Sequence, residues 1–494
     1  MGIETEYGVA VPGKPHINAM LLSTQVVSAY AQRVFAGTRH TARWSYEEET
    51  PLRDARGFDA SRAEADPSQL TDEEVGMANV ILTNGARFYV DHAHPEYSSP
   101  EVTNPRDAVL WDRAGMVVLQ RAAALAAQAP GGHPVRIYKN NTDNKGASYG
   151  CHENYLMSRL TPFADIVAGL TPFFVTRQVV TGAGRVGLGQ DGAGQGFQLS
   201  SRADFFEVEV GLETTVKRPI INTRDEPHAD PELYRRLHVI VGDANVAETA
   251  TLLKMGTTAL VLSLIERGEL GEELMPRHPV QEIHAVSHDP SLQHRLELRS
   301  GRRLTALQVQ FELLAAAAKL PDAAADQATK EILADWERVL VALERDPMSL
   351  SEDLDWVAKL SLMESYRRRD GLGWDSTRLQ LIDLQYADVD PARGIALQLE
   401  QKGRLRRITD GADVAAAVDS PPVDTRAWFR GECMRRYPAE VAAANWDSVV
   451  FDLAERHALQ RVPTLDPMRG TKEHVGPLLD RCSSGAELVA ALSG

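Results

Sequence analysis

Apolar and polar residues follow two different periods along this chain, and each period dominates a different half. Strand-like runs fall in the first half, at 86–91, 134–138, 151–157, 174–180, 205–210 and 237–241. A further short strand covers the first eight residues and ends at Gly8. Helical spacing marks the second half and two earlier stretches, predicting helices at 18–34, 106–128, 246–266, 304–319 and 325–345. Strands followed by helices predict an α+β fold rather than a regular alternation of the two.

One stretch, residues 40–78, follows neither period. It begins near Trp44 and Tyr46, continues through Pro51, and stays polar as far as Glu74 with few apolar residues. A loop of this length inside a compact domain is usually functional or mobile. We therefore predict a mobile charged insertion, and a surface segment without a function is the alternative.

A second boundary lies near the C-terminus. The pair Pro421-Pro422 follows a short alanine-rich run and is typical of a linker. About 70 residues rich in helix formers come after it. The sequence thus predicts a large domain over 1–420 and a small C-terminal domain over 421–494.

Charge and cysteine content narrow the function classes. The 494 residues carry a net charge of −16, and nucleic-acid binding draws its affinity from basic surfaces, so we expect no nucleic-acid partner. The chain contains no run of about 18 apolar residues, so no membrane-spanning helix is predicted. The first residues lack the features of a signal peptide. Three cysteines without CxxC spacing predict no disulfide framework. We expect a cytoplasmic protein.

Polar residues recur at positions i and i+2 in four strand segments. These sets are Glu4 with Glu6, Arg87 with Tyr89 and Asp91, His152 with Asn154, and Arg236 with His238. Side chains at this spacing share one face of a strand. Each set alone also fits a solvent-facing strand, a structural pair or an internal salt bridge.

Taken together, the four sets predict one sheet surface with carboxylates, two histidines and two arginines. Neighbouring carboxylates repel each other unless a cation or water lies between them. Arginine matches phosphate oxygens, and magnesium prefers oxygen ligands between protein carboxylates and nucleotide phosphates. The pattern therefore favours a metal–nucleotide site over a zinc site, which requires fixed His/Cys spacing. Asp91 is the candidate metal ligand or base.

The run Gly182–Gly187 matches the GxGxxG pattern of dinucleotide-binding proteins. That motif requires a helix directly after it, and the glycine-rich residues 188–196 are poor helix formers. We expect a glycine-rich loop between two strands instead.

Basic residues cluster around Lys217 and Arg218, with Arg202 before them and Arg224 after them. In an acidic chain this cluster can form a docking surface for a carboxylate-rich partner. Ordinary solvated charge is the alternative.

Longer motifs carry a family resemblance. They are Gly2–Gly8, Asn84–Asp91, His94–Glu101, Ser148–Tyr155, Tyr366–Asp370 and Asp383–Asp388. In this order they resemble the Pup ligase/deamidase family, whose relatives are glutamine synthetase and the carboxylate–amine ligases. The resemblance covers nearly the whole chain. It implies a glutamine-synthetase-like domain, with a curved, mainly antiparallel sheet backed by helices, before the small C-terminal domain.

The family has a ligase branch and a hydrolase branch. The insertion at 40–78 resembles a loop specific to the hydrolases, which deamidate the C-terminal glutamine of the small protein Pup and cleave Pup–lysine isopeptide bonds. The resemblance therefore implies a deamidase and depupylase with Pup and pupylated proteins as partners and no membrane. The alternatives are a Pup ligase, a catalytically silent protein that binds nucleotide or Pup, and, more distantly, a zinc hydrolase using His92, His94 and His152.

The resemblance also implies roles for individual residues, with ATP and Mg²⁺ as cofactors. Asp91 corresponds to the catalytic aspartate, and its role as nucleophile or general base stays open. The implied metal-site residues are Glu4, Tyr89, Glu96, His152 and His238. The implied nucleotide contacts are Glu6, Arg87, Ser98, Ser99, Asn154 and Arg236. Arg202 and Arg224 correspond to positions where the family binds the Pup C-terminus or its target carboxyl.

Overall fold

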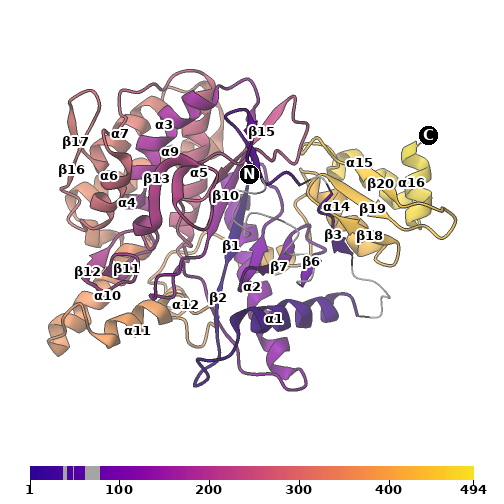
Figure 1. Ribbon diagram of the computed structural model, residues 1–494, viewed down its shortest axis with the longest axis horizontal. Helices are drawn as coiled ribbons and strands as arrows, with labels where there is room; N and C mark the ends of the chain where they lie inside the picture. Colours follow the sequence, from indigo (N-terminus) through magenta and orange to yellow (C-terminus); the bar gives the residue numbers. More distant parts are fainter. Residues whose placement is uncertain (37–41, 48, 62–77, 494) are drawn as a thin grey trace.

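A six-stranded antiparallel sheet forms the centre of the protein. In the computed structural model, which describes residues 1–36, 42–47, 49–61 and 78–493, the strand order is β15-β10-β1-β8-β7-β6 (Figure 1). Every pair of neighbours in this sheet is antiparallel. The strands are β1 (Gly2–Glu6), β6 (Asn79–Ile81), β7 (Arg87–Asp91), β8 (His94–Ser98), β10 (Cys151–Ser158) and β15 (Tyr234–Val239). The predicted antiparallel sheet is confirmed.

The two faces of this sheet differ in polarity because side chains alternate along each strand. Ile3, Phe88 and Val90 are buried on one face. Three helices pack on the sheet: α1 (Ala19–Val34), α2 (Pro105–Gln128) and α5 (Glu248–Glu266). The polar sets at i and i+2 therefore share the opposite face.

Helix ends follow the local sequence. The side chain of Asn18 accepts a hydrogen bond from the backbone N–H of Leu21 and caps α1. Asn104 caps α2 in the same way, and Pro105 occupies the first turn, where no donor is lost. The predicted helices at 18–34 and 106–128 are confirmed.

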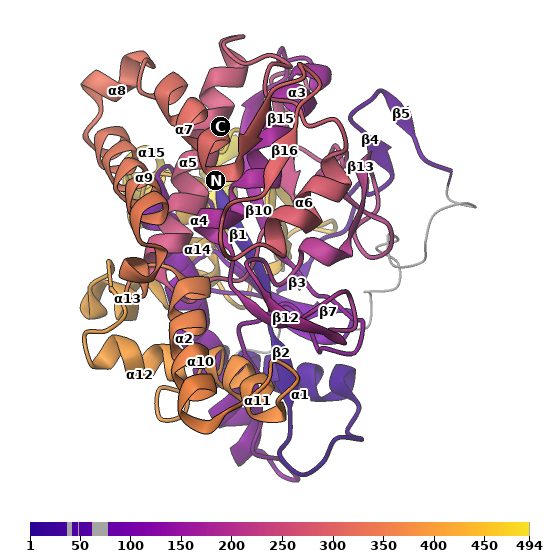
Figure 2. The ribbon, with the colours of Figure 1, turned by 90° about the vertical axis from the view of Figure 1, so that its left-hand side faces the viewer.

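Further helices surround α5 on the side of the sheet away from the C-terminal residues (Figures 1 and 2). They are α3 (Phe163–Thr176), α4 (Gln178–Thr181), α6 (Pro279–Ser287), α7 (Ala306–Ala317), α8 (Pro321–Ala325) and α9 (Gln327–Arg345). Next along the chain come α10 (Asp355–Asp370), α11 (Thr377–Tyr386), α12 (Ile395–Gln401) and α13 (Gly411–Ala417). The predicted helices at 246–266, 304–319 and 325–345 correspond to α5, α7 and α9.

Short strands form small sheets around the central one. They are β2 (Gly8–Ala10) with β9 (Arg136–Tyr138), β4 (Arg53–Asp54) with β5 (Phe58–Asp59), β11 (Arg185–Leu188) with β12 (Gly194–Gln198), β13 (Phe206–Gly211) with β14 (Arg218–Asn222), and β16 (Arg295–Glu297) with β17 (Arg303–Thr305).

One predicted strand is wrong. Residues 174–180 belong to helices α3 and α4. Their apolar side chains, including Phe174, Val175 and Val179, are buried on all sides of the helix, so the sequence shows no amphipathic period. A short apolar run of this kind does not distinguish a buried strand from a buried helix.

The glycine-rich segment also differs from its prediction. It follows a helix rather than a strand, and it folds into the hairpin β11–β12. Gly187 and Gly192 have φ angles of 92° and 65°, conformations that glycine adopts readily. The next helical segment is a short 3-10 turn at Ala203–Phe205, so the dinucleotide motif is not formed here.

The last residues form a separate layer beside the sheet edge (Figure 1). They contain α14 (Ala427–Arg436), β18 (Val441–Ala444), β19 (Ser448–Phe451), β20 (Gln460–Pro463), α15 (Lys472–Arg481) and α16 (Gly485–Ser493). Strand β3 (Arg43–Trp44) joins this sheet parallel to β18, which gives the order β20-β19-β18-β3. We call residues 421–493 the C-terminal unit, and the predicted boundary at 420 stays a prediction.

Part of the predicted insertion packs against the segment 223–226, which lies between β14 and β15. The N–H of Asp225 donates to Arg53 O at 2.9 Å, and the N–H of Ala55 donates to Thr223 O at 2.8 Å. The N–H of Thr50 donates to the Glu226 carboxylate at 2.6 Å. Residues 40, 41, 48 and 62–77, on which the predicted mobility partly depends, lie outside the described residues.

Helix α5, although it is not a continuous apolar run, is long and apolar enough by length and composition to cross a membrane. Within its most apolar window, 89% of the residues are buried inside the protein. A buried core helix passes the same length and composition test, so α5 is weak evidence for a membrane span.

Candidate active site

The strand register brings the predicted polar sets onto one surface. Glu4 on β1 lies opposite His152 on β10 and opposite Ser98 on β8. Glu6 pairs with Glu96, and Glu96 pairs in turn with Tyr89 on β7. These lateral neighbours are far apart in sequence, and only the pairing of the strands brings them together.

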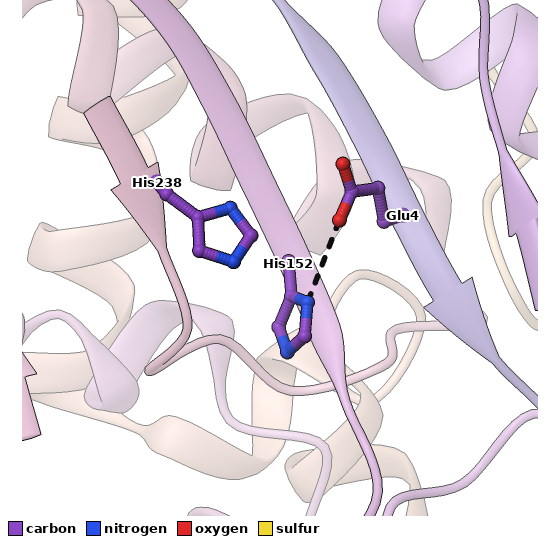
Figure 3. A group of neighbouring side chains, drawn as sticks. All are labelled: Glu4, His152 and His238. Atoms are coloured by element: carbon purple, nitrogen blue, oxygen red, sulfur yellow. Dashed lines mark ion pairs between the residues drawn. The ribbon is translucent and has the colours of Figure 1, made fainter. Parts of the chain in front are cut away.

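Three side chains from different strands form a first potential metal site (Figure 3). Glu4, His152 and His238 each place a ligand atom within 4.8 Å of the others. The Glu4 Oε2 to His152 Nδ1 distance is 3.5 Å, and the two imidazole rings lie 4.9 Å apart. Burial, with the positive charge of Arg236 added, lowers the pKa of His238 well below its usual value. A neutral imidazole with a free lone pair suits a metal ligand.

Three carboxylates form a second potential metal site beside it. Glu6, Asp91 and Glu96 also place oxygens within 4.8 Å of one another. Burial, then the charges of Asp91 and Glu6, raise the pKa of Glu96 well above its usual value. Crowded carboxylates in a buried position are the donor set that a hard divalent cation such as Mg²⁺ would neutralise.

The charges of Glu4 and Glu6 are maintained despite burial. Burial alone would raise both pKa values, but His152 and Arg236 lower that of Glu4 to about 2. At Glu6, burial would raise the pKa, but the interaction with His94 lowers it to about 2. Both groups stay ionised at neutral pH and can attract a cation.

Tyr89 lies between these carboxylates and Arg87. The Arg87 guanidinium lies 3.7 Å from the Tyr89 ring centroid and 4.1 Å from that of Trp44. Arg87 Nε donates to Asn79 Oδ1 at 3.1 Å. Stacking on two aromatic rings fixes the direction of the guanidinium over the sheet.

Two adjoining cavities open over the polar face. The larger, about 340 Å³, is lined by four predicted nucleotide contacts: Ser98, Ser99, Asn154 and Arg236. The smaller, about 120 Å³, is lined by Asp91, Arg87, Tyr89, Glu96 and both metal-site histidines. The cavities share Glu4, Ser98, His228, Arg236 and Trp446. A ligand in the larger cavity would therefore reach the metal-site residues through this shared wall.

Hydrogen bonds hold the shared wall in place. Arg236 donates to Asn154 Oδ1 at 2.8 Å and, through Nε, to Glu226 O at 2.8 Å. Asn154 Nδ2 donates to Glu4 Oε1 at 2.8 Å. Glu6, which lies outside this wall, accepts a hydrogen bond from the N–H of Gly150 at 2.6 Å, and its carboxylate lies 3.2 Å from His94 Nδ1.

The two predicted substrate arginines occupy different environments. Arg224 lines the smaller cavity and lies 3.9 Å from Glu226. Arg202 is 1% exposed, and its guanidinium donates to the carbonyl oxygens of Ile240 and Gly242. Arg202 thus supports the chain beneath the surface in this structure, and both substrate roles stay predictions.

The zinc alternative finds no support in the geometry. Among the described residues, the groups of three potential ligands that meet within 4.8 Å contain His152 but neither His92 nor His94. His94 stacks on Tyr149, with ring centroids 4.2 Å apart, and pairs with Glu6.

Sequence reasoning missed the contribution of the C-terminal unit. Arg426, Trp446, Pro467 and Met468 line the larger cavity, and Trp446 also reaches the smaller one. Glu101 holds this unit to the sheet: its carboxylate accepts from Arg426 Nε at 2.7 Å and also pairs with Arg430. His228, with a φ of 46°, was missed too; its backbone is unusual, but no sequence pattern marks it.

The fold defines the class of protein. It matches a solved structure titled as the complex between Pup and its ligase PafA, with a TM-score of 0.79 and 31% identity over 97% of this chain and 91% of that one. A structure titled as PafA in complex with ADP matches with a TM-score of 0.73 and 33% identity, over 86% of this chain and 95% of that one. The glutamine-synthetase-like fold expected from the sequence is confirmed.

Comparison with sequences gives the family. The family model described as Pup-ligase protein matches residues 1–450, and this chain belongs to that family. It is 64% identical to a depupylase of Acidothermus cellulolyticus, over 100% of this chain and 99% of that protein. It is 56% identical to the Pup deamidase/depupylase of Mycolicibacterium smegmatis, with the same coverage. A Pup–protein ligase of an Arthrobacter species is 42% identical, over 82% of this chain and 90% of the ligase.

Proposed function

We propose that this chain hydrolyses amide bonds at the C-terminal residue of Pup. It converts a C-terminal glutamine to glutamate and cleaves the isopeptide bond between Pup and a lysine. The observation that carries the proposal is the 64% identity to a depupylase over the whole chain, against 42% over 82% for a ligase. Two described residues of the insertion that resembles the hydrolase branch, Glu49 and Pro51, line the smaller cavity.

The larger cavity is the proposed nucleotide site. Apolar side chains such as Leu156, Met157 and Leu262 line it together with the polar Ser98, Asn154 and Arg236. An apolar wall with a few polar groups suits a nucleoside with phosphates at one end. A relative is described in complex with ADP. ATP is the proposed cofactor, with Arg236 and Arg87 as phosphate contacts.

The proposed Mg²⁺ site residues are Glu4, Tyr89, Glu96, His152 and His238. Glu6, predicted as a nucleotide contact, lies within reach of the same cation because its carboxylate is close to those of Asp91 and Glu96. A bound cation would neutralise the crowded carboxylates and polarise the amide carbonyl. The chain's own groups would bind and orient the amide: Arg224 would pair with a substrate carboxylate, and Asp91 would face the scissile carbonyl.

The reaction is an addition followed by an elimination. Asp91 would accept a proton from water as the water oxygen bonds to the carbonyl carbon, or would itself attack and form an anhydride that water opens. On the first route the C–N bond breaks after water has added; on the second it breaks as the anhydride forms, before water opens it. On both routes the nitrogen leaves as ammonia or as the lysine amine after taking up a proton. Amide hydrolysis is downhill, so no phosphoryl transfer is required.

The ligase reading is the alternative because ligases share the family and the fold. The test is to incubate the protein with ATP and magnesium and, in separate reactions, with glutamine-ended Pup, with a Pup–lysine conjugate, or with glutamate-ended Pup and a target protein. Glutamate-ended Pup and free target protein support the proposal. Conjugation of glutamate-ended Pup with ADP formed in proportion, and no deamidation, would show a ligase. Binding of nucleotide and Pup without either reaction would show a silent binding protein. A cytoplasmic location stays a prediction.

A further inference from the structure

The turn between β7 and β8 holds an imidazole against the carboxylate of Asp91. The turn contains only His92 and Ala93, because Asp91 pairs with His94 across the hairpin. His92 Nδ1 lies 2.7 Å from Asp91 Oδ1. Both side chains line the smaller cavity. The imidazole therefore contacts the residue proposed to carry the reaction.

The backbone of this turn is unusual for histidine. His92 has a φ of 50°, in the left-handed region that glycine and asparagine favour in two-residue hairpin turns. The turn is also anchored from behind: Ser23 on α1, which is fully buried, donates through Oγ to Ala93 O at 2.8 Å. A strained residue in a fixed turn beside a reactive group is typical of functional sites.

The contact between the two residues has a defined polarity. A carboxylate oxygen accepts hydrogen bonds, so in the tautomer with its proton on Nδ1, His92 can donate a hydrogen bond to Asp91 Oδ1 across the 2.7 Å that separates them. A carboxylate rotates easily about its last torsion angle. The nearby oxygens of Glu6 and Glu96, within 4.8 Å, would repel the Asp91 carboxylate. A donor fixed on one Asp91 oxygen therefore sets the direction of the other.

We propose that His92 is a positioning residue for amide hydrolysis. Its Nδ1–H holds Asp91 Oδ1, so that Asp91 Oδ2 faces the scissile carbonyl or the attacking water. The inference rests on the proposed function, since it requires Asp91 to act on the substrate. It adds a residue to which the sequence resemblance assigns no such role, and it holds whether Asp91 is a base or a nucleophile.

The test compares His92→Asn, His92→Gln and His92→Gly in the full chain with ATP and magnesium. Asparagine carries its amide nitrogen where Nδ1 lies and tolerates a positive φ. Glutamine carries its nitrogen one bond further out. Glycine removes the imidazole and relieves the backbone strain, so a loss in that variant does not come from misfolding.

The expected result is a pattern across the variants. The Gln and Gly variants should lower kcat for Pup deamidation by roughly 10- to 100-fold, as expected for losing a hydrogen bond to a charged group. The KM for Pup should change less than about threefold, because uniform substrate binding is not altered. The Asn variant should keep kcat within about threefold of the wild type, since the donor is restored.

Two outcomes overturn the inference: wild-type kcat in the Gly variant, or an equal loss in the Asn and Gln variants. The wild-type enzyme in the same assay separates the two proposals. Absence of wild-type hydrolysis removes the proposed function itself. Wild-type hydrolysis without the variant pattern removes only the role of His92.

Discussion

Replacing Glu101 by glutamine should loosen the C-terminal unit. In the wild type, the Glu101 carboxylate connects the sheet to two buried arginines. It accepts a hydrogen bond from Arg426 Nε at 2.7 Å, and it forms an ion pair with Arg430. Burial alone would raise the pKa of Glu101, but Arg430 and Arg426 lower it from 4.5 to about 2. Glutamine keeps the shape, loses the charge and leaves both guanidinium groups uncompensated.

The size of the effect follows from the pKa. The fall from 4.5 to about 2 corresponds to about 3 kcal/mol of stability at neutral pH. This contribution is fully present at pH values above the pKa of Glu101 in the unfolded chain, near 4.5, and it is lost as the pH falls toward the pKa in the folded protein, about 2. At pH 7 the Glu101→Gln variant should therefore lack it, and the variant should not show the acid-dependent loss that comes from this group.

Hydrogen exchange measures this locally. The amides of α14 should exchange about 150-fold faster in Glu101→Gln than in the wild type, which is the factor equivalent to about 3 kcal/mol. Glu331→Gln is the matched control, because Glu331 also pairs with an arginine, Arg106, at 2.6 Å but at the exposed surface. That control should leave α14 exchange unchanged. A change below about threefold in Glu101→Gln would refute the reasoning.

Two further predictions concern the cavities. Trp446→Ala should weaken ATP binding, measured by calorimetry, by roughly 10-fold or more, because the Trp446 side chain lines both cavities. Its ring also packs on Arg430, whose guanidinium carbon lies 4.9 Å from the ring centroid. Unchanged ATP affinity would remove the C-terminal unit from the nucleotide site. His238→Ala should lower Mg²⁺ affinity, and the magnesium concentration needed for half-maximal activity should rise, because a ligand is removed from the Glu4, His152 and His238 group; an unaltered magnesium requirement would contradict that assignment.

The residues that share the polar face of the sheet could be predicted, because the period of a strand is a local property of the sequence. A period of two places Glu4 with Glu6, and Arg87 with Tyr89 and Asp91, on one face whatever the rest of the chain does. Which strands lie side by side is a different matter. The pairing of Glu4 with both His152 and Ser98 depends on contacts between distant segments, and no local pattern determines it.

The parts that the sequence did not predict are those set by long-range packing. Trp446 and Met468 reach the larger cavity only because the C-terminal unit packs against the sheet. Strand β3 pairs with β18, about 400 residues further along the chain. A strand of only two residues leaves no recognisable periodicity in the sequence. The error at 174–180 has the same origin, because uniform burial removes the helical period from the sequence.

The most direct test of the account is the deamidation of glutamine-ended Pup by the wild type and by Asp91→Asn, measured by mass spectrometry with ATP and magnesium. Asparagine has nearly the same size as aspartate but is neither a base nor a carboxylate nucleophile. The account predicts glutamate-ended Pup with the wild type, none above background with Asp91→Asn, and equal ATP binding by both proteins. Deamidation by Asp91→Asn at the wild-type rate, or none by the wild type, would contradict it.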